Sequence, residues 1–110
     1  MNQSNAIKTI RFSGELEIGR KKQIREALQY SNADRAVLVD LSEVTYADSI
    51  ALTELLRFCV DAERAAIPVV LLVCTPQFAR IVQYAGLARA FKTFEDRDAA
   101  IAYLLERLQA

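Results

Sequence analysis

The spacing of apolar residues along the chain first predicts strands. Between residues 7 and 12 apolar and polar side chains alternate, and this period of two predicts a strand with one exposed face, closed by Ser13-Gly14. Two later runs, over residues 36–39 and 69–73, are continuously apolar and rich in β-branched residues. Such runs are typical of strands covered on both faces, as in a parallel sheet.

Helices are predicted between and after these strands. Apolar residues recur at intervals of three and four over residues 49–66, which predicts a long helix that joins the two buried runs as a βαβ unit. A narrow apolar stripe among charged residues predicts an amphipathic helix over residues 19–30. Two more helices are predicted near the C-terminus: one begins at Pro76 after the N-cap Thr75, and the last is capped by Asp96.

These elements fit one compact α/β domain. A chain of 110 residues has room for one domain and one hydrophobic core. We place the domain at residues 6–108 and interpret the polar residues 1–5 as a flexible N-terminal lead. A short extended piece near residues 91–94 supplies one further strand before the last helix.

The composition argues against several classes of function. Fourteen Lys and Arg residues balance fourteen Asp and Glu residues, so the chain lacks the basic excess of a dedicated nucleic-acid-binding protein. It contains no His, which removes imidazole from acid–base catalysis and from metal binding. Its three Gly residues cannot form a nucleotide-binding phosphate loop. We therefore expect neither an enzyme nor a bound cofactor.

The sequence also predicts a location for the protein. No apolar run approaches the roughly 20 residues that cross a bilayer. The polar start lacks the basic and apolar parts of a secretion signal. We therefore expect a cytoplasmic protein without a transmembrane segment.

The segment between the first buried run and the long helix is the most informative about function. It reads Asp40-Leu41-Ser42-Glu43-Val44-Thr45-Tyr46-Ala47-Asp48-Ser49 and lies at the carboxyl end of a strand, where partners of α/β sheets tend to bind. Asp48 is a good N-cap, which would put Ser49 at the first helical position with its hydroxyl near solvent. A phosphate on Ser49 would face free backbone N–H groups, so the fold would tolerate it. The surface would gain about 1.5 to 2 negative charges.

This segment resembles the signature loop of the STAS domain family, which is named for sulphate transporters and anti-sigma factor antagonists. The family pattern is D-L-S-x-V-x-[FY]-x-D-S-[ST]-G followed by a helix, and Gly14-Glu15-Leu16-Glu17 resembles the G-E-L-D that closes the family's early strand. The order of elements matches as well, so the resemblance covers residues 6–108. It implies an α/β fold with a mixed sheet of four to five strands and about four helices packed against it.

The resemblance also implies a function and the residues that carry it. In anti-sigma factor antagonists, the Ser directly after the motif Asp is phosphorylated by the anti-sigma factor, which is a serine kinase. The unphosphorylated form binds that kinase and releases the sigma factor. Carried over residue by residue, this makes Ser49 the phosphoacceptor of a bacterial transcription regulator. The partner-binding surface would then comprise Asp40, Thr45, Tyr46, Asp48, Ile50 and Ala51.

Two departures from the family pattern keep a second function open. Ile50 and Ala51 stand where the family has Ser or Thr and then Gly, which lets a partner approach closely. The alternative is a STAS scaffold that is not phosphorylated and docks on the ATPase of a lipid-transport complex. In addition, residues 1–5 are too short and polar to supply the strand that many members have before the first one here. The sheet edge would then be open, which permits weak self-association.

Simpler explanations exist for the same residues. Asp and Ser are common at helix starts whatever their function. Asp40 fits a role in anchoring the turn better than a metal site, because with Asp48 it would supply only two carboxylates. The basic run at residues 20–22 fits a solvated helix face or a surface for an acidic partner. Cys59 and Cys74 have no neighbouring base in the sequence, so we expect both to be structural.

Overall fold

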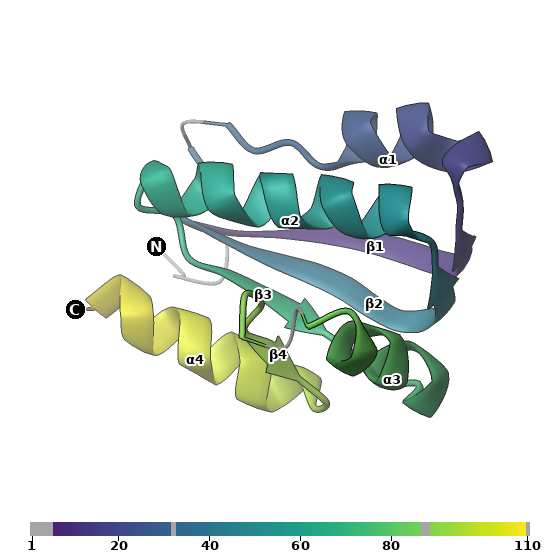
Figure 1. Cartoon of the computed structure of the whole chain (residues 1–110). Helices are drawn as coiled ribbons and strands as arrows, with labels where there is room; N and C mark the ends of the chain where they lie inside the picture. The colour runs from purple at the N-terminus through teal and green to yellow at the C-terminus, as the bar shows by residue number, and fades with distance from the viewer. Residues whose placement is uncertain (1–5, 32, 87–88, 110) are drawn as a thin grey trace.

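The computed structural model describes residues 6–31, 33–86 and 89–109, with helices on both sides of a sheet (Figure 1). The strands are β1 (Ile7–Leu16), β2 (Ala36–Ala47), β3 (Val69–Leu72) and β4 (Thr93–Phe94). The helices are α1 (Lys21–Ala27), which follows the 3-10 turn η2 (Ile18–Arg20), then α2 (Ser49–Arg64), α3 (Pro76–Tyr84) and α4 (Arg97–Gln109). The predicted lead at residues 1–5 lies outside the described residues.

The strands form one sheet in the order β1-β2-β3-β4. All three neighbouring pairs are parallel, in agreement with the continuous apolar runs of β2 and β3. The predicted α/β class is confirmed, with four strands and four α-helices. The antiparallel pair that a mixed sheet requires is not among the described strands, because each connection contains a helix that returns the chain to the same end of the sheet.

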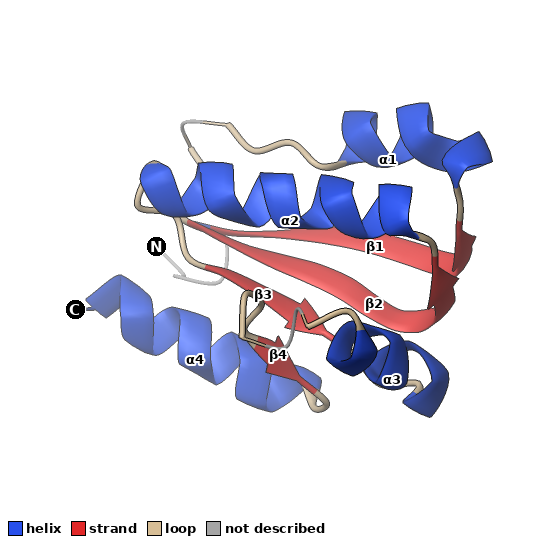
Figure 2. Cartoon of the chain, in the orientation of Figure 1, coloured by secondary structure: helices blue, strands red, loops and turns tan. Residues whose placement is uncertain are grey.

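The helices divide between the two faces of this sheet (Figure 2). α1 and α2 lie side by side on one face, where Ile24 and Leu55 are fully buried in the larger of two core clusters. α4 covers the other face, and its Ala100 and Leu104 pack in a smaller cluster that contains Leu38. β2 therefore has helices on both sides, as its unbroken apolar run predicts.

The segment that was expected to be a loop is a strand as far as Ala47. β2 continues through residues 40–47 and pairs with β1, which extends to Leu16 with two irregularities in register. Leu41 and Val44 in this part of β2 are fully buried in the larger core cluster. The loop prediction was wrong because this burial and the long partner strand, neither visible locally in the sequence, hold the segment extended.

The predicted starts of α2, α3 and α4 are confirmed. Asp48 accepts a hydrogen bond from the Ala51 N–H at 2.9 Å, and the Thr75 hydroxyl accepts one from the Phe78 N–H at 3.2 Å. Asp96 caps α4 in the same way. α1 is only seven residues long, shorter than the predicted 19–30, because the 3-10 turn η2 takes up residues 19 and 20 and the helix ends at Ala27. Side-chain caps within one turn are local contacts, which is why the sequence predicts them well.

Candidate functional site

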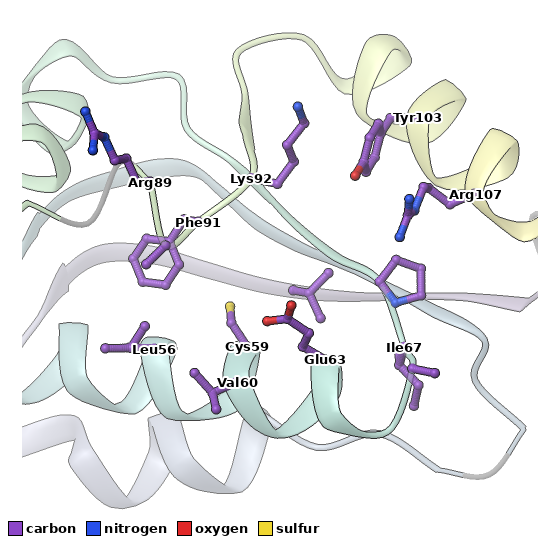
Figure 3. A pocket seen from close by; sticks show the side chains of 14 residues that line it. Leu56, Cys59, Val60, Glu63, Ile67, Arg89, Phe91, Lys92, Tyr103 and Arg107 are labelled. Atoms are coloured by element: carbon purple, nitrogen blue, oxygen red, sulfur yellow. The ribbon is translucent and has the colours of Figure 1, made fainter.

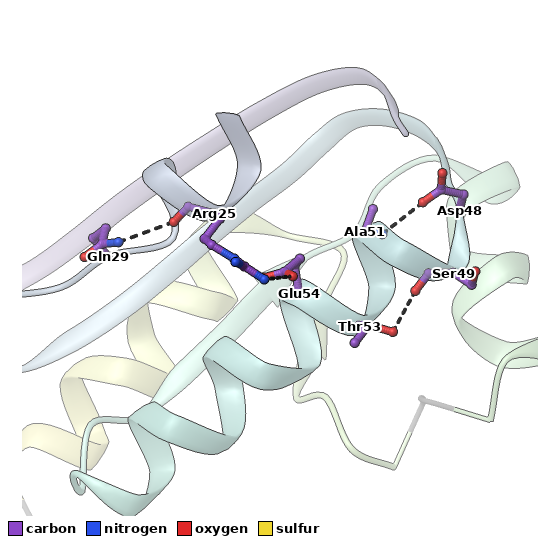
Figure 4. Close-up of polar contacts among 7 residues, drawn as sticks. All are labelled: Arg25, Gln29, Asp48, Ser49, Ala51, Thr53 and Glu54. Atoms are coloured by element: carbon purple, nitrogen blue, oxygen red, sulfur yellow. Dashed lines mark hydrogen bonds and ion pairs between the residues drawn. The ribbon is translucent and has the colours of Figure 1, made fainter. Parts of the chain in front are cut away.

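Asp48 connects the end of β1, the turn η2 and the first turn of α2. Its backbone N–H donates to the Leu16 carbonyl at 3.0 Å. One carboxylate oxygen accepts from the Ala51 N–H at 2.9 Å (Figure 4), and the other accepts from the Ile18 N–H at 2.8 Å. Three separate segments are therefore held at one point, directly before Ser49.

Ser49 is the exposed first residue of α2. Its carbonyl accepts a hydrogen bond from the Thr53 hydroxyl at 2.8 Å (Figure 4), while its own hydroxyl makes no hydrogen bond to any part of the chain that the structure describes. Backbone N–H groups at a helix start and the helix dipole favour negative charge at this end. The hydroxyl is therefore accessible, and its surroundings suit an anion.

The two residues that depart from the family pattern differ in their placement. The Ala51 side chain is only 1% exposed and packs in the core, so its methyl group does not project into a docking surface. Ile50 is half-buried beside Ser49. The Ala51 methyl group therefore does not hinder the approach of a partner. Of the two residues that differ from the family pattern, only Ile50 is accessible to one.

Apolar side chains are exposed beside Ser49, and one of them was not predicted. Tyr46, which is 42% exposed, and the exposed Thr45 lie at the end of β2. Ile18 is 62% exposed and is brought next to Asp48 by its backbone hydrogen bond. Sequence reasoning missed Ile18 because it lies 30 positions away and carries no motif.

A shallow depression of about 210 Å³ adjoins Ser49 and adds positive charge to the site. It is lined by Lys21, Ser49, Ile50, Thr53, Glu54 and Arg57. Of these, sequence reasoning noted Lys21, in the basic run at residues 20–22, but missed Arg57. One signal was available, because residues four and eight positions after Ser49 share its face of a helix. The proximity of Lys21 to Ser49 could not be predicted in this way, because Lys21 comes from another helix.

An ion pair fixes α1 against α2 beside this depression. The Arg25 guanidinium donates to both carboxylate oxygens of Glu54, at 2.7 and 3.2 Å (Figure 4). These hydrogen bonds from Arg25 lower the pKa of Glu54 against the opposing effect of desolvation, and the charges of Arg25, Arg57 and Lys21 lower it further. Glu54 therefore stays ionised while only 6% exposed, and it keeps the two helices in register at the site.

Carboxylates gather around the end of β1. The hydrogen bond and charge of Glu15 raise the pKa of Glu17, and desolvation and the charge of Asp48 add to the effect. Glu15 also pairs in the sheet with Tyr46. The start of α2 thus lies between carboxylate side chains near the end of β1 and basic side chains on α1 and α2.

Asp40 lies in the interior and not on this surface. It is 1% exposed and forms ion pairs with Arg11, at 3.1 Å, and with Arg97 at the start of α4. Desolvation alone would raise the pKa of Asp40, but hydrogen bonds from Ser42, Arg97 and Arg11 outweigh it and hold the pKa at about 2. Asp40 therefore acts as an anchor between β1, β2 and α4, in line with the simpler of its two interpretations.

Among residues 6–31, 33–86 and 89–109, Cys59 is half-buried and Cys74 is exposed. No group of three His, Cys, Asp or Glu residues within these ranges is placed to hold a metal ion. Burial, followed by the charge of Glu63, raises the pKa of Cys59 to about 12, so its thiol stays protonated. Within the same ranges, no helix has both the length and the apolar character needed to cross a membrane.

Solved structures share this architecture. A sulfate transporter family protein from Wolinella succinogenes superposes with a TM-score of 0.79 at 15% identity, over 96% of this chain and 89% of the other. An anti-sigma factor antagonist from Mycobacterium paratuberculosis gives 0.82 at 19% identity, over 91% and 86%. The unphosphorylated anti-sigma factor antagonist SpoIIAA gives 0.70 at 22% identity, over 89% and 87%.

The sequence comparisons identify the family directly. No curated protein matches the chain. The family model of the STAS domain matches residues 1–100, which is most of the chain. The segment from Asp40 to Ser49 that carries the resemblance lies inside this match and leads into α2 as the family pattern requires. The chain therefore belongs to the STAS domain family.

Proposed function

We propose that this protein is an anti-sigma factor antagonist that binds a serine-kinase anti-sigma factor and is switched off by phosphorylation of Ser49. The observation that carries the proposal is the exposed Ser49 hydroxyl at the first position of α2, directly after the Asp48 cap of a STAS domain. SpoIIAA, an antagonist of the same fold, has been solved in unphosphorylated and phosphorylated forms. The proposal extends that regulation to this chain.

The surroundings of Ser49 support a switch in binding and not in folding. A phosphate there would lie at a helix start, where negative charge is favourable. Lys21 and Arg57 line the adjoining depression and would offset part of the added charge. The exposed Ile18 and Tyr46 provide apolar surface for a partner. If Ser49 carried a phosphate, a partner that covered this surface would have to desolvate a doubly charged group, which would oppose binding.

Pull-downs from the native lysate test the proposal. Wild type, Ser49→Ala and Ser49→Asp serve as baits, with Gln77→Asp as the matched control, because Gln77 occupies the first turn of another helix, α3. We expect wild type, Ser49→Ala and Gln77→Asp to retain a serine kinase and Ser49→Asp to lose it. Retention of one kinase by all four baits would refute the switch.

A second function is favoured by Ile50, which replaces the Ser or Thr of the family pattern next to Ser49. We propose as the alternative a scaffold that is not phosphorylated and docks on the ATPase of a lipid-transport complex. In that case all baits retain the same ATPase. Mass spectrometry of the protein from cells separates the two functions, since high occupancy of phosphate on Ser49 contradicts the scaffold.

Both functions are those of a binding module. We infer a protein without catalytic activity that works in the bacterial cytoplasm, makes no direct contact with nucleic acid, and contacts its partner through the start of α2. In this proposal the partner-binding side chains are Thr45, Tyr46, Asp48 and Ile50, together with Ile18.

A further inference from the structure

A second surface feature lies at the far end of α2. A cavity of about 550 Å³ opens between the second half of α2, the start of β3, and α4. Val60 is one of its lining residues, and a rise of 1.5 Å per residue puts it about 16 Å along the helix from Ser49. The cavity is therefore separate from the proposed partner surface.

The cavity exists because β4 is too short to cover the edge of β3. The Val37 N–H donates to the Pro68 carbonyl and the Leu71 N–H donates to the Lys92 carbonyl, so backbone groups of β3 alternate between its two neighbours. By this alternation Val69 directs its N–H and C=O away from β2. β4 pairs only with Leu71 and Leu72, which leaves this part of the edge without a strand neighbour among the described residues.

The floor of the cavity is apolar. Leu56 and Val60 of α2 belong to this floor, and Ile67 and Phe91 are further apolar residues of the lining (Figure 3). Val60 is 37% exposed and is therefore accessible to a ligand in this space. A ligand with an aliphatic portion would bury this surface.

Three cationic side chains border the same space. Arg89, Lys92 and Arg107 stand along the rim opposite α2 (Figure 3), and none of them forms an ion pair with a residue in the described ranges. The Lys92 ammonium is placed instead over the Tyr103 ring, 5.1 Å from its centroid. Glu63 contributes the one carboxylate of the lining, against three cationic side chains.

We propose that this cavity binds a single-chain amphipathic anion, with its carboxylate or phosphate head at the cationic rim and its aliphatic chain on the apolar floor. The volume falls within the roughly 300 to 1,000 Å³ of small-molecule sites, and such sites combine an apolar lining with a few placed polar groups. A fatty acid and a monoacyl phosphate share this chemistry. Ligand binding in this cavity does not depend on whether Ser49 is phosphorylated, so this proposal stands apart from the proposed function.

Calorimetric titration of the full chain with four probes tests the ligand class. Decanoate and decyl phosphate carry both a chain and an anionic head, decan-1-ol carries only the chain, and inorganic phosphate carries only the charge. We expect at least one of the first two to bind with one ligand per chain and at least about tenfold more tightly than the last two. Equal binding of decan-1-ol or of inorganic phosphate, or no binding by the two anionic amphiphiles, overturns the proposal.

Charge variants locate the site. Arg107→Gln is expected to weaken binding by about three- to tenfold, and Glu63→Gln is expected to tighten it by about twofold or more, because one removes an attraction and the other a repulsion. Arg80→Gln and Asp61→Asn make the same charge changes outside the cavity and should leave affinity unchanged. If cavity variants and controls behave alike, the ligand binds elsewhere.

A final pair of variants tests the apolar floor. Val60→Asp puts a charge on the floor at a partly exposed helix position, so it is expected to abolish binding without unfolding the chain. Val60→Thr removes apolar character with little change of shape and should weaken binding by severalfold. Circular dichroism and the unfolding midpoint check the fold of both variants. Undiminished binding by a folded Val60→Asp protein overturns the proposal.

Discussion

The two ends of α2 are held in different ways. At its start, the carboxylate of Asp48 accepts hydrogen bonds from Ala51 and from Ile18, and the Arg25–Glu54 ion pair adds a further contact in the second turn. At its end, Ala66 adopts a left-handed backbone conformation with φ of 61°, and the Ile67 N–H donates to the Ala62 carbonyl at 2.8 Å. The start is fixed by side-chain hydrogen bonds, whereas the end combines backbone hydrogen bonds with the apolar packing of Phe58 and Ile67.

This difference accounts for what each end can do. A rigid start presents Ser49 in one orientation, as required for recognition by a partner. The end of the helix has no such side-chain hydrogen bonds among the described residues and lies beside an uncovered sheet edge, where the cavity is found. The same helix therefore carries the proposed docking surface at one end and an open cavity at the other.

The largest expected effect comes from removing the side-chain contacts at the start of α2. Asp48→Ala deletes the cap and the hydrogen bond from Ile18, and together these should cost about 2 kcal/mol of unfolding free energy. Asp48→Asn keeps one acceptor oxygen and should cost about half as much. Urea unfolding of both variants measures the difference. If both unfold like wild type, Asp48 does not hold the start of the helix.

The buried Asp40 shows how much a carboxylate anchor can contribute elsewhere in the fold. Its pKa is held at about 2, below its ordinary value of 3.8, so its contribution is present above pH 4 and is lost as the pH falls through 2. Because Arg11 and Arg97 are partly exposed, we expect this contribution to be about 1 to 2 kcal/mol. The stability difference between wild type and Asp40→Asn should shrink by this amount from pH 6 to pH 2. A difference that does not change with pH contradicts the assignment.

A substitution at the end of α2 should increase the stability of the protein, in contrast to the substitutions at its start. Ala66 occupies a left-handed conformation that costs an L-residue energy, whereas Gly adopts it freely. Ala66→Gly is therefore expected to raise the unfolding free energy by about 0.5 to 1 kcal/mol. Ala65→Gly, one position earlier and at negative φ, is the control and should destabilise the protein. The midpoints of urea unfolding distinguish the two.

The smallest effect on stability is expected at Ser49. An added negative charge at the helix start is mildly favourable, so Ser49→Asp should change the unfolding free energy by less than about 0.5 kcal/mol. Binding of the kinase partner should nevertheless be lost. Thermal unfolding and titration with the captured partner measure the two quantities on the same samples. A large loss of stability would show that Ser49 supports the fold, contrary to the proposed switch.

Local patterns in the sequence predicted much of this molecule. The buried strands β2 and β3 follow from the pattern of apolar residues alone. The helix caps follow from contacts within a few residues, at Asp48, Thr75 and Asp96. Each residue in such a pattern has the same neighbours in any fold that contains the element. For this reason, the class of fold, the helix starts and the position of Ser49 at the first turn of α2 followed from the sequence.

Contacts between distant segments were settled by the tertiary structure. The extension of β2 to Ala47 depends on pairing with β1, and the exposed Ile18 reaches the site through a hydrogen bond across 30 positions. Burial of Asp40 between Arg11 and Arg97 likewise joins three separate elements. The cavity beside α2 depends on how far β4 follows β3. These features arise from how elements pack, because the side chains involved become neighbours only after the sheet has formed.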